Sequence, residues 1–264
     1  MELQSEVIQN EDNLIGLFYK YFSVDSLYLL VIPYCLFQPV FGIWAKQSSY
    51  YEKNKLKCKK IMAYYNVIMS IFSFICATTM IYCLFNLKNG VYALGHFDDE
   101  LVGKIYTKVV YVFYISKYVE FLDTYFLILC GRPVIWLQYL HHIGAPLACG
   151  FPYHWNVEGA WIFVSFNGVI HTFMYYYYAC CIMKWKFPLP KKFLTLLQIF
   201  QFIFGPMSSI AYAFVDGYMQ NDAKRFGWYF QNGYVFMNLV LFLNFYRKTY
   251  MKSNKTTKES IKKD

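Results

Sequence analysis

Charged residues are scarce in this sequence. They form 16% of its 264 residues, while hydrophobic residues form 58%, and soluble domains carry about 25% charged residues. One soluble core of this size has no room for so much apolar surface, so the composition excludes an ordinary soluble domain. Only five histidines are present, too few for a di-iron site of the histidine-box type. The acidic segment 1–25 has no basic region ahead of an apolar run, so we expect no cleavable signal peptide.

Seven apolar runs approach the length of about 20 residues that a membrane-spanning helix needs. We therefore predict an all-α fold: a polytopic membrane protein with seven transmembrane helices in a single domain, residues 1–264. The acidic segment 1–25 precedes the first span and a basic tail, 247–264, follows the last. The predicted spans are Ser26–Ala45, Met62–Phe85, Ile105–Cys130, Pro133–Tyr153, Gly159–Met183, Phe193–Val215 and Trp228–Tyr246.

Lysine and arginine are unevenly distributed between the two sides of the predicted membrane domain. With a cytoplasmic tail, 18 of the 25 lie on that side, in segments 46–61 and 184–192, at Arg132 and in the tail. Five lie on the other side. This bias predicts a lumenal N-terminus and a cytoplasmic C-terminus, and it accounts for the net charge of +9 without nucleic acid. The tail ends in Lys262-Lys263-Asp264, which is similar to a dilysine signal for the endoplasmic reticulum but one position closer to the end.

Polar side chains occur inside four of the spans, where a charged group costs roughly 2.5–3.5 kcal/mol at a helix centre. In the third span Lys117, Glu120 and Thr124 share one helical face, and Asp123 lies at its border. The spacing leaves two interpretations open. One is an i, i+3 ion pair that fixes helix packing, and the other is the polar wall of a substrate chamber.

The fourth span holds Gln138, His141 and His142, whose spacing of three and four residues lets them converge. This grouping favours a functional site over a packing role. Zinc would need a third ligand such as His171. Because adjacent histidines point about 100° apart on a helix, chelation by both is hindered and we expect no metal site.

The fifth span carries Asn167, His171, Tyr175 and Tyr178 in one helical stripe. The amide of Asn167 can fix the tautomer of the imidazole one turn away. The tyrosines near the cytoplasmic end also fit an interfacial aromatic belt, but Asn167 and His171 lie too deep for that explanation.

The sixth span carries Thr195, Gln198 and Gln201 at steps of three residues. Glutamines can simply join membrane helices by hydrogen bonds. Four polar stripes in adjacent spans, however, predict a shared buried chamber. Without a metal, a histidine there can act as a nucleophile, and the acyl-imidazole so formed needs a dry chamber to survive.

The order and spacing of these stripes resemble the ELO family of very-long-chain fatty acid elongases, the membrane 3-ketoacyl-CoA synthases. The likeness is close over residues 105–205, and the seven-span plan covers nearly the whole chain. The family motifs read K-x-x-E-x-x-D-T, H-x-x-H-H, N-x-x-x-H-x-x-M-Y-x-Y-Y and an L-Q-x-x-Q run. Matching residues here are Lys117, Glu120, Asp123, Thr124, His141, His142, Asn167, His171, Met174, Tyr175, Tyr177, Tyr178, Gln198 and Gln201.

The resemblance implies a reaction in which a long-chain acyl-CoA condenses with malonyl-CoA to give 3-ketoacyl-CoA, carbon dioxide and CoA. It implies no resident cofactor, since both thioesters are substrates. It also implies six helices in a barrel around an acyl tunnel open to the cytoplasm, in the membrane of the endoplasmic reticulum. Expected partners are membrane lipid, the ketoacyl reductase, dehydratase and enoyl reductase of the elongation cycle, and a second copy of the chain in a homo-oligomer.

The resemblance further implies roles for individual residues. His141 is the nucleophile, while His142 and His171, the latter oriented by Asn167, assist proton transfer. The other site residues bind substrate. The polar end of the chamber is shaped by Lys117, Glu120 and Asp123, and the thioester and pantetheine groups are bound by Gln198, Gln201 and Tyr175. The CoA phosphates are bound by Arg132, Lys184, Lys186, Lys191 and Lys192.

One departure from the family pattern stands at Gln138, where most members have the first histidine of the box. An amide donates and accepts hydrogen bonds but does not shuttle a proton at neutral pH. Three alternatives of other classes remain open: a seven-helix receptor, a transporter with a buried polar site, and a histidine-box desaturase. The sequence lacks the extracellular cysteine pair usual in such receptors and the inverted repeats of many transporters. It also has too few histidines for a desaturase.

Overall fold

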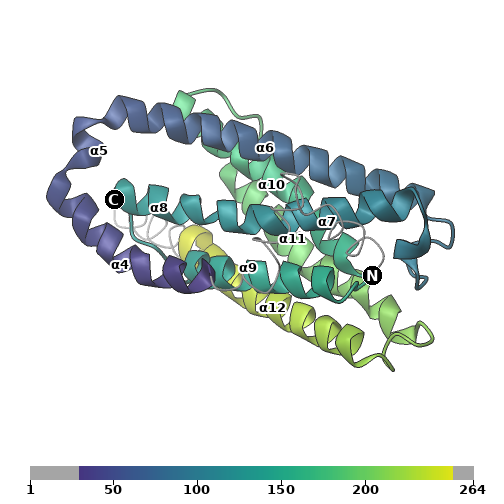
Figure 1. Cartoon of the computed structure of the whole chain (residues 1–264). Helices are drawn as coiled ribbons and strands as arrows, with labels where there is room; N and C mark the ends of the chain where they lie inside the picture. The colour runs from purple at the N-terminus through teal and green to yellow at the C-terminus, as the bar shows by residue number, and fades with distance from the viewer. Residues whose placement is uncertain (1–29, 252–264) are drawn as a thin grey trace, which may run out of the picture.

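The computed structural model describes residues 30–251, and within that range the regular structure is entirely helical, as predicted. The segment 1–25 and most of the tail 247–264 lie outside the described residues. Long helices run alongside one another, with α6 along one edge and α12 along the other (Figure 1). The helices are α4 (Val31–Ser48), α5 (Tyr50–Lys53), α6 (Lys55–Asn86), η2 (His96–Asp98), α7 (Val102–Val119), α8 (Phe121–Leu129), α9 (Trp136–His154), α10 (Ala160–Met183), α11 (Lys191–Ile210), η3 (Ala211–Phe214), α12 (Asp222–Tyr246) and the π-helical turn η4 (Arg247–Met251).

The third predicted span, Ile105–Cys130, is not one continuous helix. It divides at Glu120 into α7 and α8, because the Asp123 amide donates to the Glu120 carbonyl at 3.0 Å, three residues back instead of four. α8 ends at Leu129, and the turn beyond it contains Gly131, whose φ of +68° suits a residue without a side chain. The Arg132 amide bonds back to the Leu127 carbonyl at 2.9 Å and closes that turn.

Two helices of the described residues are long and apolar enough to cross a membrane: α6, Lys55–Asn86, and the segment Lys191–Phe214 that joins α11 to η3. They correspond to the second and sixth predicted spans. The described parts of the other five predicted spans also coincide with helices, but polar side chains and the break in the third lower their apolar character. Their membrane crossing stays a prediction.

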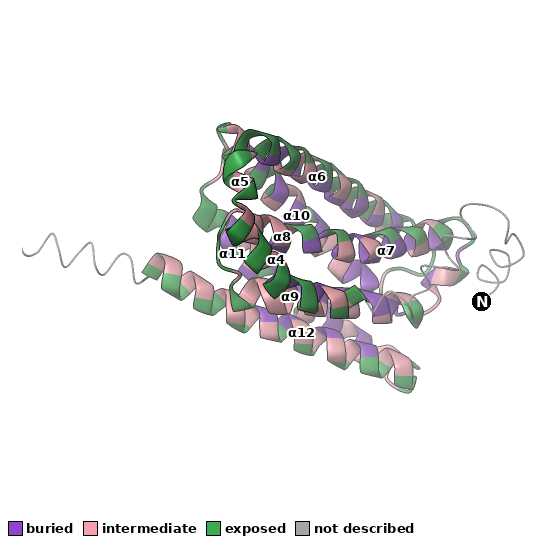
Figure 2. Cartoon of the chain, turned by 60° about the vertical axis from the view of Figure 1, so that its left-hand side comes forward, coloured by how far each residue is buried: buried purple, intermediate pink, exposed green. Residues whose placement is uncertain are grey.

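In α6, polar side chains face other helices and apolar side chains face outward, which is the reverse of a surface helix in a soluble protein. Asn66, Ser70 and Ser73 are buried, while Ile68 is 64% and Phe74 is 56% exposed. Figure 2 shows exposed residues along the outward sides of α4 and α6 and buried ones on the sides that face other helices. An apolar exterior around polar interior contacts is the arrangement that lipid surroundings favour.

Small residues bring α6 and α10 close together. A side chain at Gly168 would meet Ala77 and the Ser73 carbonyl at 3.1 and 3.2 Å, so glycine lets the two backbones approach. The Ser70 hydroxyl donates to the Thr172 carbonyl at 2.8 Å across the same contact. This packing fixes α10, which carries part of the site described below.

The basic segments gather at one end of the bundle, which we call the basic end: residues 46–61, Arg132, residues 184–192 and Arg247. α5 and the end of α8 both lie there (Figure 1). α11 and η4 are joined at this end, where Thr195 and Tyr250 share a hydrogen bond of 3.3 Å. All four segments therefore lie on one side, as the charge distribution requires.

A buried ion pair ties together the opposite end. Glu158, before α10, accepts from the Lys224 ammonium at 2.6 Å and from the Gly95 amide at 3.4 Å. Its carbonyl accepts from the Tyr106 hydroxyl at 2.6 Å. Burial lowers the pKa of nearby His96 below its usual value, which keeps that imidazole neutral near pH 7. α7, α12 and the loop before α7 are thus all hydrogen-bonded to one residue, Glu158: α12 and the loop through its carboxylate, and α7 through its backbone carbonyl.

Replacing Glu158 with alanine is expected to destabilise this end, because the Lys224 ammonium loses its carboxylate. Removal of one partner of a buried pair costs about 3–5 kcal/mol, and we expect the lower part of that range since the Lys224 side chain is 17% exposed. The measurement is thermal unfolding in detergent. Glu52→Ala is the control, because its 3.3 Å pair with Lys55 is open to solvent. Equal unfolding temperatures for the two variants would contradict the assignment.

Candidate active site

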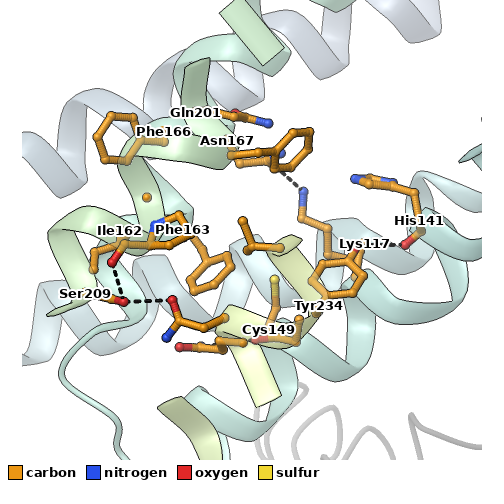
Figure 3. Close-up of a pocket in the computed structure, with 18 of the residues that line it drawn as sticks. Lys117, His141, Cys149, Ile162, Phe163, Phe166, Asn167, Gln201, Ser209 and Tyr234 are labelled. Carbon is orange, nitrogen blue, oxygen red and sulfur yellow. Dashed lines mark hydrogen bonds between the residues drawn. The ribbon is translucent and has the colours of Figure 1, made fainter. Parts of the chain in front are cut away.

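A cavity lies inside the bundle between α7, α9, α10, α11 and α12. Its polar wall is formed by four of the residues that the sequence singled out: Lys117, His141, Asn167 and Gln201. The rest of the wall is mainly apolar, with aromatic and aliphatic side chains such as Phe113, Ile162, Phe163, Phe166, Phe202 and Val235. Figure 3 shows Lys117, Asn167 and His141 converging on this space from three helices.

Lys117 is the centre of the polar wall. Its ammonium donates to Glu120 Oε1 at 2.7 Å and to Asn167 Oδ1 at 2.8 Å. It also lies 4.1 Å from the ring centroid of Phe113, where the aromatic face attracts a cation. Both charged residues are only 2% exposed. The i, i+3 ion pair is therefore present, and its lysine also lines the cavity.

The orientation of His171 follows from this network. Since Asn167 Oδ1 accepts from Lys117, its amide nitrogen faces His171 Nε2, at 3.0 Å, and donates to it. The neutral imidazole then carries its hydrogen on Nδ1, which lies 3.4 Å from Glu120 Oε1. That separation is long for a hydrogen bond but close enough for the carboxylate to stabilise a positive charge on the ring. His171 is buried.

His141 is the histidine that lines the cavity. Its ring centroid lies 6.4 Å from that of His171 and 5.4 Å from that of His142. The Tyr234 hydroxyl donates to its carbonyl at 3.0 Å. A side chain at Gly144 would overlap the Tyr234 ring, so glycine is what lets α12 reach the backbone of His141.

His142 points to a different environment from its neighbour. Its Nε2 lies 2.7 Å from the Gln138 amide nitrogen, one helical turn earlier. The same amide nitrogen is 3.4 Å from Thr124 Oγ1. His142 does not line the cavity. The predicted convergence of Gln138 with both histidines is thus realised for His142, while His141 turns toward the cavity.

Several predicted substrate-binding residues lie outside the cavity wall. The Tyr175 hydroxyl donates to Asp123 Oδ2 at 2.7 Å, and the Gln198 amide contacts Met174 Sδ at 3.6 Å. Gln201 lines the cavity, is 7% exposed, and its Oε1 has no hydrogen-bond partner within residues 30–251. Arg132 is exposed beyond α8, at the basic end.

α12 contributes cavity-lining residues that the sequence motifs did not indicate. Gln231, Asn232 and Tyr234 line the cavity, and the Ser209 hydroxyl of α11 donates to Asn232 Oδ1 at 2.8 Å. The signal was present, because an amide pair inside an apolar run is as unusual here as in the four spans singled out.

No group of three or more His, Cys, Asp or Glu side chains is placed to hold a metal ion in the described part of the chain. The chemical groups at the cavity are an imidazole, an ammonium already paired with a carboxylate, several amides, the hydroxyls of Ser209 and Tyr234, and the thiol of Cys149. Such a set can supply a nucleophile, hydrogen bonds to a carbonyl, and proton transfer through His171 and Glu120.

Known proteins are similar to this sequence over most of its length. The family model described as ELO: GNS1/SUR4 matches residues 21–258. Very long chain fatty acid elongase 5 of Xenopus laevis is 29% identical, over 83% of this chain and 75% of its own length. Fatty acid elongase sre1 of Dictyostelium discoideum is 28% identical, over 92% of this chain and 87% of its own. The motifs and the match over most of the chain agree, and the chain belongs to the ELO (GNS1/SUR4) family.

Proposed function

We propose that this protein is a fatty acid elongase that condenses a long-chain acyl-CoA with malonyl-CoA, giving 3-ketoacyl-CoA, carbon dioxide and CoA. The observation that carries the proposal is the position of His141. It is the one histidine of the described residues on the wall of a largely apolar cavity, and it lies beside the Lys117–Glu120–Asn167–His171 network. The names of the relatives support the same reaction class.

The reaction begins with attack of an imidazole nitrogen of His141 on the thioester carbonyl. The carbon–sulfur bond breaks, CoA leaves as the thiol with the proton that the acylated ring gives up, and the acyl group remains on the neutral imidazole. Malonyl-CoA then loses carbon dioxide, and the resulting enolate attacks the acyl carbonyl. The carbon–nitrogen bond breaks, and the imidazole of His141 takes up the one proton that the overall reaction consumes as 3-ketoacyl-CoA forms.

Neighbouring groups support these steps. Because Glu120 lies beside Nδ1 of His171, the ring can accept a proton and keep the charge stabilised. Gln201 can donate to the thioester or enolate oxygen through its amide. Asp123, Tyr175 and Gln198 act from behind the wall, holding α8, α10 and α11 in place. The apolar lining excludes water from the acyl-imidazole.

The proposed architecture is a seven-span protein in which α4 lies outside and the six spans from α6 to α12 surround the acyl tunnel as a barrel. The basic end faces the cytoplasm and the N-terminus faces the lumen of the endoplasmic reticulum. The proposed contacts for the CoA phosphates are basic residues of the basic end: Arg132, Lys184, Lys186, Lys191 and Lys192. The reductases and dehydratase of the cycle, lipid and a second copy of the chain are the proposed partners.

His141→Ala is expected to abolish condensation, because it removes the nucleophile. Purified full-length protein in detergent is incubated with C12–C20 acyl-CoA and labelled malonyl-CoA, and CoA release and labelled 3-ketoacyl product are measured. Mass spectrometry of the protein incubated with acyl-CoA alone should show an acyl adduct that His141→Ala lacks.

His154→Ala is the matched control, since His154 lies exposed at the end of the same helix. It should retain the adduct and turnover. An adduct that persists in His141→Ala would move the nucleophile elsewhere, and absence of turnover by the unaltered protein across all chain lengths would refute the elongase assignment.

Lys117→Met is expected to lower condensation by about a hundredfold, since the loss leaves Glu120 without its cation and Asn167 without the donor that fixes its amide. Lys108→Met on the same helix is the control, because Lys108 is exposed. Rates are compared at saturating substrate together with unfolding temperatures. A Lys117→Met enzyme as fast as Lys108→Met would show that the network does not serve the reaction.

A further inference from the structure

Gln138 occupies a position with its own hydrogen-bond chain. Its amide nitrogen faces two atoms, His142 Nε2 at 2.7 Å and Thr124 Oγ1 at 3.4 Å. An amide nitrogen can only donate. His142 Nε2 must therefore be the unprotonated nitrogen of the ring, and the hydrogen of the neutral imidazole lies on Nδ1.

The chain continues to α4. Thr124 Oγ1 and the Tyr34 hydroxyl share a hydrogen bond of 2.9 Å, and both residues are at most 2% exposed. The Tyr34 ring stacks on Phe121 with centroids 4.0 Å apart and lies 6.3 Å from the ring of His142. A helix whose other face is largely exposed is thus attached to the bundle at the residues that surround His142.

His142 and His171 sit in contrasting surroundings. His171 lies 3.4 Å from the Glu120 carboxylate, so a positive charge on its ring is stabilised. His142 is packed against the rings of Tyr34 and Phe121, and no charged side chain of residues 30–251 is hydrogen-bonded to it. Protonation of its Nε2 would place a donor against the Gln138 donor at 2.7 Å.

We propose that Gln138 is a positioning residue: through its bonds to His142 and Thr124, and with Tyr34 behind them, it holds His142 as the neutral tautomer with hydrogen on Nδ1. The inference rests on the proposed elongase function. His142 then acts as a fixed hydrogen-bonding group beside the nucleophile, and the travelling proton belongs to His171. The amide performs the orienting role and cannot itself take up a proton.

Three substitutions of Gln138 test the direction of the bond. Gln138→Met keeps the size and removes the donor, so the turnover number should fall roughly ten- to a hundredfold with little change in KM for acyl-CoA. Gln138→Glu keeps the shape but can only accept, so it should lose activity as well and add an ionisation to the pH profile. Gln138→His can still donate and should restore turnover at neutral pH.

Control variants and a spectroscopic measurement accompany the Gln138 substitutions. Gln47→Met, on an exposed part of α4, should match the unaltered protein. Tyr34→Phe should lower turnover about two- to fivefold, as loss of about one hydrogen bond's free energy at a distance would, whereas Tyr64→Phe on the exposed face of α6 should not. ¹⁵N spectra of histidine-labelled protein, with His142→Gln for assignment, should show an unprotonated Nε2.

Several outcomes would overturn the proposal. A Gln138→Met enzyme with unchanged turnover would do so, as would a Gln138→Glu enzyme with unchanged activity and pH profile, or a protonated Nε2 in the spectra. If a Gln138 variant does not fold, the ¹⁵N spectra of the unaltered protein still test which nitrogen of His142 carries the hydrogen. If the unaltered protein has no condensation activity, the proposed function fails, while the spectra still report on the tautomer.

Discussion

An ammonium and a carboxylate inside an apolar bundle are tolerated only when each is paired and its remaining hydrogen bonds are made. The Lys117–Glu120 pair meets this condition with partners from two elements: the α7–α8 junction supplies both charges, and α10 supplies Asn167 and His171. Displacing α10 would leave the ions paired but would remove the Asn167 acceptor from the buried Lys117 ammonium. The orientation of the amide and of the imidazole is therefore a consequence of burying this one pair.

The residues on the two sides of the break at Glu120 have different partners. α8 places Thr124 beside Gln138 and Tyr34 of α4, while α7 places Lys117 at the cavity. The two histidines of α9 thus receive different neighbours. His141 meets the cavity and the charged network, and His142 meets a neutral chain of an amide and two hydroxyls.

Contacts within one helix could be predicted from the sequence, and contacts between helices could not. Asn167 and His171, or Gln138 and His142, are four residues apart, so helical geometry alone places them together. The family was likewise predictable from the motifs. The hydrogen bond between Asp123 and Tyr175, which lie outside the cavity lining, joins α8 to α10 and depends on how these two helices pack. The Tyr234–His141 contact depends on how α12 packs against Gly144.

The polar groups of the cavity are mostly engaged with one another, and this limits what remains for a substrate. Lys117 is held by Glu120 and Asn167, and Ser209 is held by Asn232. Of the described polar side chains on the wall, Gln201 keeps a buried oxygen without a partner, and the imidazole of His141 makes no side-chain hydrogen bond there. Because most of the other polar groups already have hydrogen-bond partners, water in this space would gain few hydrogen bonds. The proposed acyl-imidazole would need such a dry chamber, and the mutual hydrogen bonding of the wall is consistent with one.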